Sequence, residues 1–141
     1  MFFVFAALAD FILFVLHVAA IFIGEPAYLF LRAGKVMAEA DARGETWPAI
    51  LTGAISTVFL AWAVISFWAG TNKPFARWAR YLMIGIGIVF LLRGGVIVLQ
   101  LGGMAQFSDG EAPQMRDFIF SVSALFIGLL HLAAVFKDKP R

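Results

Sequence analysis

One apolar stretch, residues 81–101, limits most strongly what this chain can fold into. Its length matches that of a helix crossing the hydrocarbon core of a bilayer, which takes about 20 residues, so it predicts a transmembrane helix. Its one charged residue is Arg93. A guanidinium at the centre of such a helix costs about 2.5–3.5 kcal/mol on insertion scales. Another group of the chain, a ligand or a partner protein must therefore offset this cost.

Composition assigns the chain to the membrane class. Of its 141 residues, 62% are hydrophobic and 14% are charged, and the mean hydropathy is +0.92, whereas soluble domains are about 25% charged. The length allows one helical bundle, so we expect a single integral membrane domain over residues 1–141, located in the cell (inner) membrane. The net charge is only +2 and no basic stripe is present, which argues against nucleic acid as a partner. The absence of cysteine excludes disulfides and thiolate metal sites.

Three further stretches have the same apolar character. Together they predict an all-α bundle of four transmembrane helices. The expected spans are residues 2–23, 48–69, 79–101 and 114–136.

The segment after the first span is expected to form an amphipathic extension. Pro26 cannot donate a helical hydrogen bond, so the helix kinks or restarts there. Residues 27–42 have a helical pattern and either continue the first helix through the headgroups or lie as a short helix at the interface. The apolar face expected for this helix consists of Leu29, Ala33, Val36, Met37 and Ala40.

The distribution of basic residues predicts the orientation. Four spans place both termini on one side of the membrane, and that side carries more lysine and arginine than the other. By the positive-inside rule we expect both termini in the cytoplasm. The basic residues on the side of the termini are Lys73, Arg77, Arg80, Lys137, Lys139 and Arg141.

Small residues recur at helical spacing and predict close helix packing. They also exceed what one short bundle needs for its own contacts, so we expect a homo-oligomer or a subunit of a larger membrane complex. The candidate packing residues are Gly53, Thr57, Gly87, Gly94 and Gly128.

Six polar residues inside or at the edge of the spans are the candidate site. The simplest arrangement pairs Arg93 with an acid of the first helix, Asp10 or Glu25, and the sequence leaves both open. The network is then either a structural ion pair or a site for a proton, an anion or an amphipathic headgroup; alternatively, Arg93 faces a partner subunit. The candidate residues are Asp10, His17, Glu25, Arg93, Gln100 and His131.

The two histidines raise the idea of a haem held by two axial ligands. An axial pair must lie at the same depth, whereas His17 and His131 are expected to differ by about 15 Å, so no cofactor is predicted. For His131 we expect an interhelical hydrogen bond, with Asp10 or Ser121 as partner. No phosphate loop, zinc-protease motif or nucleophile elbow appears, so no catalytic or metal residue is proposed and a non-enzymatic role is favoured.

Short motifs in the last two spans resemble a family of small four-helix bacterial membrane proteins without an assigned function. The motifs are Arg80-Tyr81, residues 90–95 (FLLRGG), Ser121-x-Ser123 and residues 128–132 (GLLHL). The resemblance covers about half the chain. It implies the fold and an importance of Arg93, but no activity.

Three functions follow as hypotheses. The first is a non-enzymatic accessory or structural subunit of a membrane complex. The second is a small transporter or channel for a proton, an anion or an amphipathic solute, with the polar network lining its path. The third is a membrane-embedded protein that handles a cofactor, a lipid or a quinone.

Overall fold

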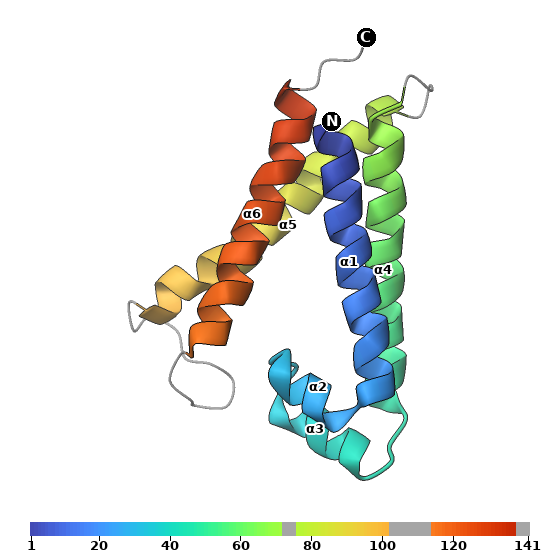
Figure 1. The fold of residues 1–141 in the computed structure, drawn as a ribbon, viewed down its shortest axis with the longest axis vertical. Helices are drawn as coiled ribbons and strands as arrows, with labels where there is room; N and C mark the ends of the chain where they lie inside the picture. The colour runs from blue at the N-terminus through green and yellow to red at the C-terminus, as the bar shows by residue number, and fades with distance from the viewer. Residues whose placement is uncertain (72–75, 102–113, 138–141) are drawn as a thin grey trace. The chain divides into compact units, whose positions relative to one another are not determined.

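The computed structural model describes residues 1–71, 76–101 and 114–137, except for the side chains of Gln100 and Leu101. Within these ranges the chain is helical almost throughout and contains no strand (Figure 1). In a bilayer a spanning segment must satisfy its own backbone hydrogen bonds, which a helix does.

Four long helices confirm the predicted all-α fold with four spans. Each is long and apolar enough to cross a membrane, so the protein is a multi-pass membrane protein. The third begins three residues earlier than expected, because the helix continues through Trp78 and Arg77 to Ala76. The helices are α1 (Phe2–Ile23), α4 (Trp47–Ala69), α5 (Ala76–Leu101) and α6 (Met115–Lys137).

The segment between α1 and α4 differs from the prediction. Helix α1 ends before Gly24, and the helix restarts at Glu25 with Pro26 in its first turn, as Pro26 indicates. The expected continuous helix over residues 27–42 is wrong, because the chain breaks into α2 (Glu25–Phe30) and α3 (Lys35–Ala42). At the break, Arg32 and Gly34 both have positive φ angles, 58° and 102°.

The break also changes which residues are buried. Of the expected apolar face, Met37 and Ala40 are buried, whereas Leu29, Ala33 and Val36 are exposed. The reason is that α2 and α3 are separate helices that pack against each other as a hairpin, so their apolar positions no longer share one face. The buried cluster consists of Ala20, Ala27, Tyr28, Met37 and Ala38.

The hairpin is closed at its base by a carboxylate. Asp41, near the end of α3, accepts a hydrogen bond from the backbone N–H of Glu25, at 2.8 Å from its Oδ2. This bond satisfies one of the backbone donors that a helix start leaves open. Gly24 has φ 75°, and a Cβ there would lie 2.5 Å from the same oxygen, so the contact requires glycine.

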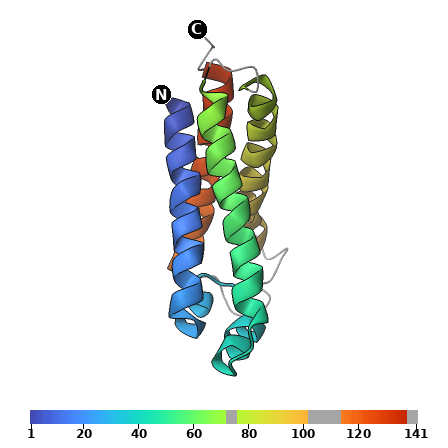
Figure 2. The same ribbon diagram turned by 90° about the vertical axis from the view of Figure 1, so that its right-hand side faces the viewer.

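The chain forms two compact units. Unit 1 consists of Met1–Ala9 and Trp62–Arg141, and unit 2 of Asp10–Ala61, so the boundary falls inside α1 and α4. In unit 2, α1 and α4 lie side by side (Figures 1 and 2), and the side chain of Ile21 lies opposite Gly53. The prediction of a single domain over residues 1–141 stays a prediction.

In unit 1, an apolar cluster at the start of α1 and the end of α4 packs against α5 and α6. Four of its six buried members are alanines, which allow the helices to approach closely. The six are Phe3, Ala6, Ala69, Ala79, Met83 and Ala134.

Backbone contact between α5 and α6 depends on glycine. A Cβ added at Gly94 would lie 2.7 Å from the carbonyl oxygen of Ser121 and 2.8 Å from the backbone nitrogen of Leu125. A Cβ at Gly128 would lie 2.8 Å from the carbonyl oxygen of Gly87. A backbone atom cannot move aside as a side chain can, so any larger residue would push the helices apart.

We expect Gly94→Ala to lower the free energy of unfolding by about 1–3 kcal/mol, because the added methyl group overpacks the contact between α5 and α6. Gly95→Ala is the matched control, since a Cβ at Gly95 meets nothing within 4 Å. The control should stay within about 1 kcal/mol of the wild type. Reversible unfolding in detergent measures both, and equal stabilities of the two variants would contradict the described packing.

Candidate functional site

The predicted polar residues fall into both units. Arg93 and His131 lie in unit 1, and Asp10, His17 and Glu25 in unit 2. The expected ion pair of Arg93 with Asp10 or Glu25 would join the two units, so it stays a prediction. The same holds for the argument against a haem between His17 and His131. The side chain of Gln100 lies outside the described residues.

A buried polar pair connects α4 with α6 in unit 1. The Oγ of Ser66 lies 3.3 Å from Nε2 of His131, and both side chains are completely buried. The Nδ1 of His131 lies 2.9 Å from the carbonyl oxygen of Ile127, one turn earlier. A carbonyl can only accept, so Nδ1 carries the hydrogen, and Nε2 of the neutral imidazole can accept from Ser66.

Aromatic rings cover this pair. The ring of Phe90 stacks on that of His131 with centroids 5.7 Å apart, and Trp62 contacts Phe90 edge-on at 5.6 Å. A hydrogen bond in such an apolar setting is not weakened by competing water. Chemically, the pair can hold the two helices in register. It can also exchange a proton at Nε2, because a hydroxyl donates to imidazole and accepts from imidazolium.

Ser66 was not among the residues expected to contact His131. A single serine in an apolar span does not reveal its partner, because its hydroxyl can donate to a carbonyl of its own helix as readily as to a group on another helix. Ser121, one of the two expected partners, is buried as well, but it lies against Gly94 of α5 through its backbone oxygen. A contact of His131 with Asp10 would join the two units and stays a prediction.

Arg80 holds the end of α4 in the same unit. Its Nε donates to the carbonyl oxygen of Ala69 at 3.2 Å, and its guanidinium lies 5.1 Å from the centroid of the Phe3 ring. A cation at a helix C-terminus satisfies an open carbonyl and interacts favourably with the helix dipole. This arginine therefore has a structural function.

Arg93 has a different environment. It is exposed, as are its neighbour Leu92 and the residues one turn before it, Ile88 and Val89. Within residues 1–71, 76–101 and 114–137, no ion pair of Arg93 is found. Arg93 lies about 18 Å along the helix axis from Tyr81. Tyr81 is exposed and contacts Trp78 edge-on, as expected of an interfacial aromatic belt. Arg93 is therefore near the middle of the apolar stretch of residues 81–101.

Two further candidates, Asp10 and His17, lie in α1, and Glu25 lies at the start of α2. Asp10 is completely buried. His17 is half-buried; its Nδ1 lies 2.8 Å from the carbonyl oxygen of Leu13, and its ring lies 4.8 Å from that of Phe59 in α4. Glu25 is exposed at the start of α2. Asp10 is thus an acid inside a span, whereas Glu25 lies at its end.

The remaining packing candidates lie in α4. Thr57 is exposed, and its Oγ1 donates to the carbonyl oxygen of Gly53 at 2.9 Å. Its neighbour Ser56 is buried and makes the equivalent bond to the oxygen of Thr52 at 2.8 Å. Such bonds satisfy a hydroxyl within its own helix.

Metal binding has no candidate in the described part of the chain, where no group of three histidine, aspartate or glutamate side chains comes together. Comparisons with protein-family models, with curated proteins and with solved structures give no match to this chain. The assignment of a function therefore depends on the geometry of its own residues.

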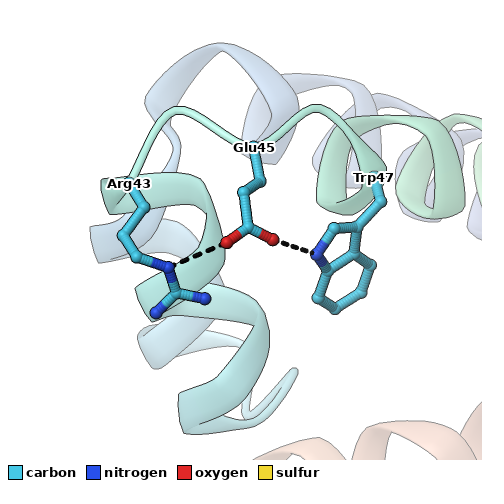
Figure 3. Close-up of polar contacts among 3 residues, drawn as sticks. All are labelled: Arg43, Glu45 and Trp47. Carbon is cyan, nitrogen blue, oxygen red and sulfur yellow. Dashed lines mark hydrogen bonds and ion pairs between the residues drawn. The ribbon is translucent and has the colours of Figure 1, made fainter.

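A second polar cluster lies outside the spans, where α3 leads into α4 (Figure 3). The carboxylate of Glu45 accepts hydrogen bonds from Nε of Arg43 and Nε1 of Trp47, both at 2.8 Å. These two bonds hold the pKa of Glu45 below its ordinary value, and the bond from Arg43 has the larger effect. The cluster fixes Trp47 at the start of the second span, where an aromatic ring prefers the interface.

We expect Ser66→Ala to lower the free energy of unfolding by about 0.5–2 kcal/mol, because it removes a buried hydrogen bond between two transmembrane helices. Ser123→Ala is the control, since Ser123 is an exposed serine of α6. Unfolding in detergent measures the difference. If both variants were equally stable, Ser66 would not contribute to the contact between α4 and α6.

The Glu45 cluster predicts a pH dependence. A carboxylate whose pKa is lowered by folding stabilises the protein above its ordinary value of 4.5, and this contribution is lost as the pH falls through the lower folded pKa. We therefore expect wild type to exceed Glu45→Gln in stability at neutral pH and to lose this advantage in acid. Unfolding curves over pH measure it. The same difference in stability at every pH would contradict the charged contact. Arg43→Gln should reduce the pH-dependent difference, because it removes the cation that binds Glu45.

Proposed function

We propose that the protein is a non-enzymatic membrane subunit that acts in an accessory or structural capacity within a homo-oligomer or a larger complex of the inner membrane. The observation that carries the proposal is the exposed position of Arg93 near the middle of a span. A group that is not part of α5 has to pair with this guanidinium.

Lipid does not satisfy Arg93 at this depth. In a helix the Cα–Cβ bond tilts toward the N-terminus, which for α5 is the end at Ala76. The interface on that side, marked by Tyr81, is about 18 Å away, which is beyond the reach of an arginine side chain. The other end of α5, at Leu101, is about 12 Å away and lies against the direction of the Cα–Cβ bond. A protein carboxylate is the group that best offsets the charge.

The apolar surface does not distinguish between lipid and protein neighbours. Only 17% of the α1 span and 33% of the α5 span are buried. In a bilayer such a surface can face acyl chains or helices at similar cost, because lipid tails are as apolar as leucine. The charge of Arg93 does distinguish the two kinds of neighbour, because a guanidinium is unfavourable against lipid but not against a protein group that pairs with it.

The proposal includes a topology. Both termini lie in the cytoplasm, as the excess of lysine and arginine on that side favours. The α2–α3 segment then lies at the outer interface, since it joins two spans that end at the same membrane face. Exposed apolar side chains next to cations support this location.

A small transporter or channel is the second candidate. It is favoured by the complete burial of Asp10 within α1 and by the buried pair of Ser66 and His131. Ionisable and polar residues inside spans often form proton or ion paths. In that case Arg93 would line a water-filled path and would not face a partner.

We expect Arg93→Leu to release the protein from its complex while the monomer stays folded. Removing one member of a buried ion pair costs about 3–5 kcal/mol, so association should weaken by about 100-fold or more. Arg93→Lys, which keeps the charge, should weaken the association less. Native electrophoresis after mild solubilisation measures the size of the assembly.

Leu92→Ala is the matched control, because Leu92 is the exposed neighbour of Arg93 without a charge. It should leave the assembly intact. If wild type and Arg93→Leu both ran as monomers, the proposal would be wrong. An intact assembly with lost ion or solute flux in Arg93→Leu would instead favour the transporter.

A further inference from the structure

The tip of the α2–α3 hairpin combines exposed apolar side chains with cations. Phe30 is 56% and Val36 71% exposed, and Lys35, which is exposed, begins α3. Arg32, half-buried, lies in the turn between the two helices. Water favours neither a phenylalanine nor a valine in such positions, so another apolar phase is expected to cover them.

The charges of the hairpin are separated along its length. The acids Asp41 and Glu45 lie at the base, where Asp41 accepts from the start of α2 and Glu45 is bound by Arg43. Between base and tip, Glu39 is an exposed acid one turn after Lys35. The end that carries Phe30 and Val36 is therefore the basic end.

Arg32 occupies a position that the backbone would normally give to glycine. The N–H of Ala33 bonds the oxygen of Tyr28 at 2.9 Å, and the N–H of Arg32 bonds that of Leu29 at 3.4 Å. This is the Schellman end of a helix, in which the residue at the Arg32 position is left-handed and usually glycine. With φ 58°, Arg32 is in that strained conformation, which costs an L-residue about 1–2 kcal/mol. A residue that costs stability at its position points to a requirement for its side chain.

The position of the hairpin limits what can cover its tip. It connects α1 with α4, which both cross the membrane, so it lies at the level where these helices leave the hydrocarbon core. Within unit 2, α2 and α3 run across the direction of α1 (Figure 1). A segment in this orientation lies along the membrane surface, where acyl chains meet headgroups.

We propose that the hairpin tip binds the headgroup of an anionic phospholipid, with Arg32 and Lys35 on its phosphate and Phe30 and Val36 among the upper acyl chains. Arginine is suited to phosphate because its planar guanidinium donates two parallel hydrogen bonds. This inference rests on the interfacial location of α2–α3 proposed above, and it adds the ligand and the residues that bind it.

The first experiment measures lipid preference. The full chain is placed in nanodiscs of phosphatidylcholine and phosphatidylglycerol, and the lipids that remain bound are counted by native mass spectrometry. Wild type should retain phosphatidylglycerol above its bulk fraction, and added salt should reduce the enrichment. Arg32→Gly and Lys35→Gln should each lower the preference by about fivefold.

Arg32→Gly separates binding from folding, since glycine relieves the strained backbone. This variant should be as stable as wild type or more stable, and yet bind less anionic lipid. Arg43→Gln is the matched control, because Arg43 is an exposed cation bound to Glu45 at the other end of the hairpin. It should keep the preference. The proposed headgroup binding would be contradicted if both tip variants kept the lipid preference of the wild type. It would also be contradicted if Arg43→Gln lost as much of that preference as the tip variants.

The second experiment tests the location alone. The chain has no cysteine, so Val36→Cys gives a unique position for an environment-sensitive dye, and Ala42→Cys, near the base, gives a reference. Spin-labelled lipids should quench the dye at position 36 more strongly than the dye at position 42. Equal quenching would overturn the location, whereas quenching without a lipid preference would overturn only the binding. Neither result depends on the complex proposed for Arg93.

Discussion

The structure depends on a constraint that the bilayer imposes: no polar group in the hydrocarbon core can rely on water. The backbone meets this constraint by forming helices, which explains why nearly all described residues are helical. The constraint also removes the hydrophobic force between helices, since lipid tails are as apolar as leucine. Contact between the helices then depends on close packing and on a few polar bonds. At Gly94 and Gly128 the backbones of α5 and α6 approach so closely that no side chain fits between them.

The polar side chains of the spans meet the same constraint in different ways. His131 does so within the fold, because the backbone oxygen of Ile127 binds one of its nitrogens and Ser66 the other. Arg80 does so at a helix end, where the open carbonyl of Ala69 accepts a hydrogen bond from it. Arg93 is exposed at mid-span and does not follow either pattern. The contrast between Arg80 and Arg93 on one helix separates an arginine that stabilises the fold from one available to another molecule.

The sequence determines the four spans because length and composition alone decide whether a helix can cross a bilayer. It predicts the restart at Pro26 because proline lacks a donor. The break at Arg32 could not be predicted, because arginine carries no preference for a left-handed conformation and the helical pattern continues through it. Ser66 was missed because one hydroxyl in an apolar helix has no signature. The acid opposite Arg93 stays undetermined, since periodicity gives the face and depth of a residue but not the rotation of one helix against another.

Arg93 and Arg32 share one property despite their different surroundings. Each occupies a position where most other residues would cost less: Arg93 in hydrocarbon, where a leucine would be favourable, and Arg32 in a backbone conformation suited to glycine. Packing alone would have favoured leucine at one position and glycine at the other. We propose a different interaction for each: a carboxylate of a protein helix at mid-depth for Arg93, and a lipid headgroup at the membrane surface for Arg32.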